Sequence, residues 1–113
     1  MVVTNIGKNR IRDLIAQDAY NASFGTDNTT PTVDDTDLIA KDSNTTHDVV
    51  ATTSDRTVNI KHILLSTDAN GVTLKEFGVY LNNGADLLDR VVFPDLDKTS
   101  SEEIHTIITL RIE

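Results

Sequence analysis

The chain has 113 residues, which bounds it to a single domain, because domains typically hold about 100 to 150 residues. Its net charge of −8 repels phosphate backbones and anionic membrane surfaces, so we expect neither nucleic acid nor membrane as a partner. It contains no cysteine, which excludes disulfides and thiolate zinc sites and leaves packing, or association with copies, to stabilise a small core.

The N-terminal part of the chain predicts one helix followed by one strand. Over about residues 6–18, Ile11, Leu14 and Ile15 recur at helical spacing, while charged side chains fill other positions. Residues 20–24 then alternate between apolar and polar side chains and stop before a glycine, which is typical of a short strand closed by a turn.

A polar, acidic loop is expected over about residues 26–48. Its residues are mostly Thr, Asp and Asn, which favour turns and cannot form a core. Within it, residues 36–41 predict a brief helical turn with Asp34 or Asp35 as its N-cap. We interpret the loop as a solvated segment; a contact surface for a basic partner is the alternative.

The remainder, about residues 48–112, predicts β-strands. Residues 48–53 and 57–65 form a hairpin, and strands at 73–81 and 87–93 follow, each after a turn that contains Asn and Gly. Pro94 is expected to end the second of these strands because proline lacks the N–H that a sheet needs. The last segment alternates most clearly, and its inward-facing positions are expected to be Ile104, Thr106, Ile108, Leu110 and Ile112.

Several short strands joined by turn residues, with a single helical pattern at the start, favour a mainly β fold. We therefore expect residues 1–113 to form one antiparallel β-sandwich with one N-terminal α-helix, in place of alternating strand–helix units.

Few residues form a pattern that is typical of a catalytic, metal or cofactor site. The aspartates of the acidic loop lack the alternating register and the bidentate Glu of a calcium loop, and the three histidines lie on separate expected segments. No nucleophile elbow or phosphate-binding glycine run is present. We therefore expect no enzyme activity, no metal and no cofactor. The residues considered as metal ligands are Asp27, Asp34, Asp35, Asp37, His47, His62 and His105.

A series of short motifs in the second half of the chain occurs in a recognisable order. An Ala-Asn-Gly turn at 69–71 leads into a Glu-Phe-Gly-Val-Tyr strand at 76–80 and a Leu-Leu-Asp-Arg strand at 87–90. Phe93, a Lys-Thr pair at 98–99 and alternating aliphatics follow. This order resembles the small β-rich module at the start of tail fibre and tail-collar proteins of tailed viruses, from phages or archaeal viruses.

The first half is similar to the same module, through its opening helix and its Gly-Thr and Pro-Thr loop motifs. The residues that we single out as its structural motif are Asn70, Gly71, Glu76, Gly78, Arg90, Phe93 and Lys98. Glycine at 78 within a strand predicts a bulge or a close backbone approach. Glu76 and Arg90, on neighbouring strands, are expected to pair across the sheet, worth ~0.2–1 kcal/mol.

The resemblance implies a non-enzymatic structural protein of the virion, made in the host cytoplasm and docked to other virion proteins as a homo-oligomer, with a trimer suggested. Because the chain ends at Glu113, directly after its last expected strand, we expect a small stand-alone subunit of tail fibre or baseplate adaptor type. A capsid decoration or turret protein is one alternative. A host-surface glycan-binding module is another, and it requires exposed aromatic side chains. An acidic cellular β-domain is a third.

Overall fold

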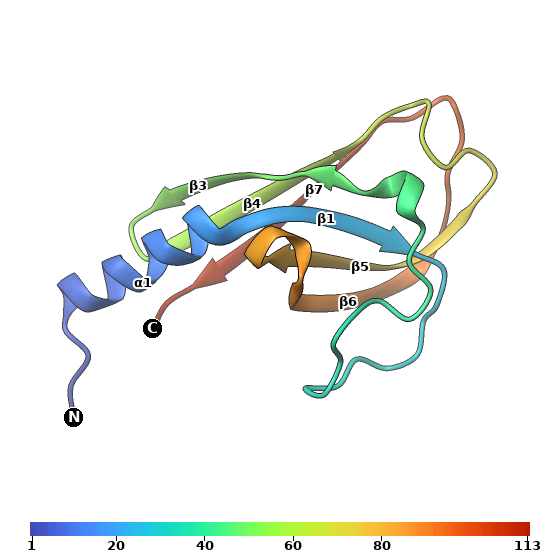
Figure 1. The fold of residues 1–113 in the computed structure, drawn as a ribbon. Helices are drawn as coiled ribbons and strands as arrows, with labels where there is room; N and C mark the ends of the chain where they lie inside the picture. Colours follow the sequence, from blue (N-terminus) through green and yellow to red (C-terminus); the bar gives the residue numbers. More distant parts are fainter.

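The computed structural model describes all residues from Met1 to Glu113. It is mainly β, with 46% strand and 18% helix, and two antiparallel sheets pack against each other (Figure 1). This confirms the predicted fold class. The elements are α1 (Asn5–Asp18), β1 (Ala19–Gly25), η1 (Ser43–Thr45), β2 (His47–Asp48), β3 (Val50–Ser54), β4 (Thr57–Leu64), β5 (Thr73–Leu81), η2 (Asn82–Gly84), β6 (Asp86–Asp97) and β7 (Ile104–Arg111). No helix has both the length and the apolar composition needed to cross a membrane.

The two sheets differ in size and in their connections. Sheet A has the strand order β2-β1-β5-β6, and sheet B has the order β3-β4-β7. The chain crosses between the sheets from β2 into β3, from β4 into β5 and from β6 into β7. The edge strands are β2 and β6 in sheet A and β3 and β7 in sheet B.

Helix α1 is the N-terminal extension of sheet A. Thr4 caps its start, since the Thr4 hydroxyl accepts a hydrogen bond from the Gly7 N–H at 3.1 Å. The helix runs directly into β1 and lies against β3 and β4 (Figure 1). Ile15 and Ala16 pack against the core, but no residue of the helix is fully buried. The helix thus covers one end of the sandwich with a single turn of apolar side chains.

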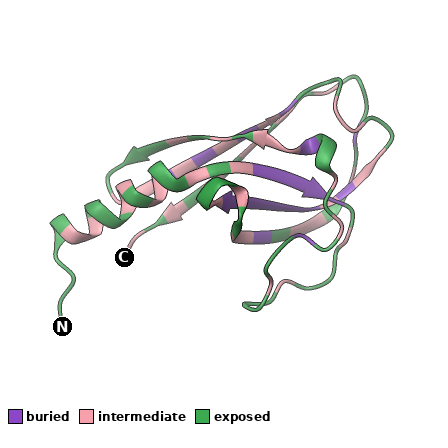
Figure 2. Cartoon of the chain, in the orientation of Figure 1, coloured by how far each residue is buried: buried purple, intermediate pink, exposed green.

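The core is thin, as expected for a chain of this length. Only 18 of the 113 residues are buried, and most of them lie on β1, β4 and β5; Figure 2 shows them most plainly along β1 and β5. Several of the buried side chains are polar or charged, so hydrogen bonds satisfy buried groups alongside the apolar contacts. The apolar core cluster consists of Ala22, Phe24, Val58, Ile60, Leu64, Leu74, Phe77 and Val79.

The predicted helical turn at 36–41 was wrong. The N–H groups of Ile39 and Ala40 donate to the Glu76 side chain, and Lys41 forms an isolated antiparallel bridge with Gly25, so this segment forms bends and a bridge in place of a helical turn. The only helical turn in the loop is η1, which Asp42 caps by accepting from the Asn44 N–H at 3.0 Å. Contacts to a distant strand outweighed the local preference.

The prediction that Pro94 ends a strand was also wrong, because β6 continues through it to Asp97. The ladder between β5 and β6 is irregular between Leu74 and Glu76, where the facing residues of β6 shift from Leu96 to Val92. Pro94 lies in that irregular stretch of an edge strand, where a missing N–H breaks no regular ladder bond.

The Asn-Gly turn at 70–71 leads from sheet B to sheet A and does not close a hairpin, since β4 and β5 belong to different sheets. Gly71 adopts a positive φ of 82°, as the turn signal predicts. The alternation of the last strand is confirmed: its even-numbered residues are half-buried and its odd-numbered residues are exposed. They are only half-buried because β7 is an edge strand.

Candidate functional site

The seven motif residues come together in two polar clusters and one apolar contact. Glu76, Gly78 and Arg90 lie under the loop of residues 26–42, which we call the covering loop because it covers the outer face of sheet A. Asn70, Gly71 and Lys98 meet where the chain crosses between the sheets, and Phe93 packs on the core.

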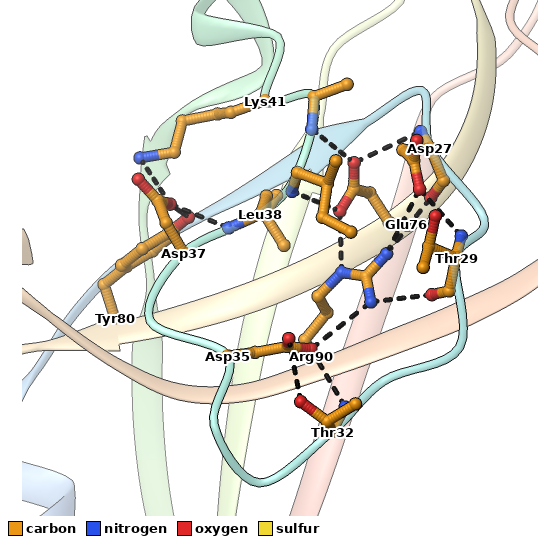
Figure 3. A network of polar contacts seen from close by, with 12 residues as sticks. Asp27, Thr29, Thr32, Asp35, Asp37, Leu38, Lys41, Glu76, Tyr80 and Arg90 are labelled. Carbon is orange, nitrogen blue, oxygen red and sulfur yellow. Dashed lines mark hydrogen bonds and ion pairs between the residues drawn. The ribbon is translucent and has the colours of Figure 1, made fainter.

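The Glu76 side chain is the centre of the first cluster. It is completely buried, yet each of its two oxygens accepts hydrogen bonds (Figure 3). Oε1 accepts from the Arg90 Nε at 2.8 Å and from the Ile39 N–H at 3.0 Å. Oε2 accepts from the N–H groups of Ala40 at 2.9 Å and Asp27 at 3.2 Å. One carboxylate from the sheet therefore holds both ends of the covering loop.

Arg90 extends the same anchor from the neighbouring strand. Its side chain is only 1% exposed, and its Nη1 donates to the Thr29 carbonyl at 2.8 Å. Two loop carboxylates lie beside the guanidinium, Asp35 at 3.4 Å and Asp27 at 3.7 Å. Although burial opposes its charge, the hydrogen bond and negative charge of Glu76 raise the pKa of Arg90. The pair predicted from the sequence is present, but as a buried network in place of a surface pair.

The loop aspartates are held in their charged form. Hydrogen bonds from Thr29 lower the pKa of Asp27, and hydrogen bonds from Thr32, offset in part by burial, lower the pKa of Asp35; Arg90 adds to both shifts. These aspartates, weighed above as calcium ligands, instead organise the loop and neutralise Arg90. No group of three or more His, Cys, Asp or Glu side chains is arranged to hold a metal ion.

A second contact ties the loop to the far end of β5. The Tyr80 hydroxyl donates to Asp37, and Lys41 lies 3.3 Å from the same carboxylate and 4.3 Å from the centre of the Tyr80 ring. Burial, reinforced by the Asp37 carboxylate, raises the pKa of Tyr80. Tyr80 is therefore a buried hydrogen-bond donor and not an exposed platform for a sugar ring.

Gly78 lies where the Leu38 side chain of the covering loop closely approaches the sheet. A Cβ at this position would lie 2.8 Å from the Leu38 side chain, 2.9 Å from Leu87 and 3.0 Å from the Asp89 carbonyl. No real side chain fits at those distances, so the motif glycine marks a close approach, one of the two roles that its position predicts. Leu38 is itself buried and is the apolar anchor of the loop.

The second cluster joins the two chain crossings between the sheets. The Lys98 ammonium is buried and donates to the Asn70 side-chain oxygen at 3.0 Å and to the carbonyls of Ser66 at 3.3 Å and Thr99 at 2.8 Å. The Gly71 N–H donates to the Lys98 carbonyl at 2.8 Å. All three donors of the ammonium are satisfied, as a structural lysine requires. This contact between the Ala-Asn-Gly and Lys-Thr motifs was not predicted.

The three histidines do not converge. His62 is buried and its Nε2 donates to the Thr45 carbonyl at 2.8 Å, which leaves Nδ1 without a partner. His47 pairs with Asp68 at 2.7 Å, and the exposed His105 pairs with Glu103 at 2.6 Å. Thr45 forms hydrogen bonds with the backbone of β1 and with His62. This structural role was not predicted, because Thr45 lies in a polar segment with no pattern that distinguishes it.

Two hollows remain on the surface. A cleft of about 290 Å³ lies between the covering loop and the start of β6, and Asp35 and Asp89 line it with apolar neighbours. Burial raises the pKa of Asp89, but the Val79 N–H already donates to that carboxylate. A smaller groove of about 190 Å³ opens between β6 and β7, and it is lined by Phe24, Phe77, Val91, Phe93, Leu96, Ile104 and Thr106.

Comparisons with protein families, with curated proteins and with solved structures give no match for this chain.

Proposed function

We propose that the chain is a non-enzymatic structural protein of a tailed virus, of tail fibre or baseplate adaptor type, which docks to other virion proteins. The observation that carries the proposal is the role of the residues on which the resemblance rests. Glu76, Gly78 and Arg90 fasten the covering loop, and Asn70 and Lys98 fasten the crossings between the sheets. Each of these residues has a structural role in the domain.

A fixed shape is what a docking protein needs. Association costs less when loops are already ordered, because less conformational entropy is lost on binding. Here the loop backbone is bonded to a buried charge pair, which is expected to specify one arrangement more than to add stability. The homotrimer that the resemblance suggests is part of this proposal.

A glycan-binding role has less support. Sugar rings stack on exposed aromatic faces. Phe24, Phe77 and Tyr80 are at most 3% exposed, Phe93 is half-buried beside the groove, and Tyr20, at 44%, is the one exposed aromatic residue. The alternative of a capsid decoration or turret protein has the same docking chemistry and differs in copy number.

The test is to find the chain in purified particles. Particles from infected cells that express the chain are separated on a density gradient, and its peptides are quantified by mass spectrometry against the major capsid protein. We expect the chain to co-purify with particles in a small multiple of three or six copies, as the resemblance to fibres implies. Hundreds of copies would assign it to the capsid surface instead. A chain found only in the soluble fraction would contradict the proposal.

A further inference from the structure

The four edge strands of the two sheets are not equally protected against pairing with another chain. In sheet A, β2 has only 2 residues, and β6 is interrupted by Pro94 and by two register irregularities. In sheet B, β3 has 5 residues. By contrast, β7 has 8 residues, no proline or glycine, and an uninterrupted register with β4. Short, bulged or proline-containing edges resist strand addition, so β7 is the one long edge without such protection.

Apolar surface lies on both sides of that edge. On the outer face of sheet B, Ile107 is 59% exposed. On the inner face, Ile104 and Thr106 line the apolar groove, whose floor is formed by the core residues Phe24 and Phe77. A strand added to β7 would thus bury aliphatic surface on both faces of the sheet.

We propose that β7 pairs with β7 of a second copy, antiparallel and about a twofold axis at Ile107, which joins the two B sheets into one six-stranded sheet. Directly opposite residues of neighbouring strands point to the same face. A symmetric pair of identical strands must therefore place one residue opposite its own copy, and the register is defined by which residue that is.

Charge complementarity selects Ile107 as the centre. In this register Ile107 faces its own copy, and Arg111 faces Glu103 of the second copy, twice by symmetry. A centre at Ile108 would place Glu113 opposite Glu103 and Arg111 opposite His105. A centre at Thr106 would leave Arg111 opposite the neutral Ser101. Within the single chain Glu103 pairs with His105 at 2.6 Å and Arg111 with Glu113 at 3.5 Å, but the Glu103 and Arg111 side chains are 48% and 57% exposed, so each can exchange this surface pair for one across the interface.

The same register also covers the apolar groove. On the inner face it places Leu110 of the second copy beside Ile104, and Ile108 of the second copy beside Thr106, where the groove opens. These aliphatic residues are half-buried in the single chain because β7 is an edge, and pairing would complete their burial. The contact follows from the strand edge alone and goes beyond the proposed function; if the trimer also forms, the two contacts together give an even-numbered assembly.

The first experiment measures the oligomer mass of the full chain by sedimentation velocity and light scattering from about 1 to 100 µM. We expect an even number of copies, and a roughly tenfold weaker association constant for either Glu103→Arg or Arg111→Glu, because each replaces two attractive pairs with repulsive ones. The double variant restores the opposite charges and should return the constant to near the wild-type value. A monomer or an odd-numbered oligomer at every concentration, or single reversals without effect, would overturn the proposal while leaving virion assembly open.

The second experiment uses the absence of cysteine from the chain. Ile107→Cys places one thiol on the proposed axis, where facing Cα atoms of antiparallel strands lie about 4.5–5.5 Å apart, within the range that a disulfide spans. Mild oxidation should give a covalent dimer that a reductant reverses. Val50→Cys is the matched control, because Val50 is 64% exposed on the same face and in the same cross-strand row, but on β3. Equal cross-linking of the two variants, or none at position 107, would contradict the register.

Discussion

The two sheets of this sandwich differ in how much of their surface other parts of the chain cover. Sheet A is covered on both faces, by sheet B on the inside and by the covering loop on the outside, so that β5 is buried along most of its length. Sheet B is covered on its inner face only, and the outer residues of β4 and β7 reach solvent. Within a chain of 113 residues, sheet A has both faces covered, whereas sheet B keeps an open outer face and, in β7, a long regular edge strand.

The difference shows how a loop with few apolar residues can serve as a layer. Leu38 is the only buried apolar residue of the covering loop, so apolar burial alone cannot hold it in place. The Glu76–Arg90 pair supplies the rest by satisfying backbone N–H and carbonyl groups of the loop. A buried charge pair of this kind does little for net stability if exchanged whole for apolar residues, but it is costly to break on one side.

Breaking the Glu76–Arg90 pair should have the largest effect on stability. Arg90→Met removes the guanidinium and leaves the Glu76 carboxylate buried without its countercharge, so we expect a loss of about 3–5 kcal/mol in the free energy of unfolding. Urea denaturation followed by circular dichroism measures it. Arg10→Met, at an exposed site on α1, is the control and should change stability by less than about 0.5 kcal/mol. Equal effects of the two variants would mean that the network does not hold the loop.

A smaller effect is expected from crowding the contact between loop and sheet. Gly78→Ala would press a methyl group against Leu38 and Leu87, and we expect a loss of about 1–3 kcal/mol together with displacement of the covering loop. Gly7→Ala is the control on α1, where the nearest atom would be the Thr4 hydroxyl at 3.3 Å and alanine favours the helix. Backbone amide exchange at Ile39 and Ala40 should quicken in the first variant only. Unchanged exchange there would contradict the close approach as the reason for glycine.

Periodicity along the sequence predicted the elements whose contacts are local in pattern. The helix, the β3–β4 hairpin and the alternation of β7 are all present, because one face of each element packs on the core. The turn expected at 36–41 is absent because its backbone bonds to Glu76, which lies more than 35 residues away in the chain. Local propensity carries no information about such a partner.

The candidate site was predicted only in part, because it too depends on contacts between residues that are distant in the chain. Cross-strand spacing suggested that Glu76 and Arg90 pair, and they do. That the pair is buried could not be predicted, because burial comes from a loop that joins other elements of the fold. The contact between Asn70 and Lys98 depends on two crossings of the sandwich meeting at one end, which no spacing along the chain reveals.

The smallest expected effect is a pH dependence that arises between the sheets. Burial lowers the pKa of His62 below its ordinary value of 6.5, so the unfolded chain binds this proton more readily than the folded one, and stability should fall as the pH drops below 6.5. The paired His47 and Asp68 lie nearby, and the lowered pKa of Asp68 adds a further loss only below about pH 3.8. One proton accounts for at most about 1.4 kcal/mol per pH unit. His62→Gln should therefore reduce the change in the urea denaturation midpoint between pH 7.5 and 5.5. His105→Gln, at an exposed site, should leave the dependence of the midpoint on pH as in the wild type. A wild-type slope in the His62 variant would contradict the assignment of the pH dependence to His62.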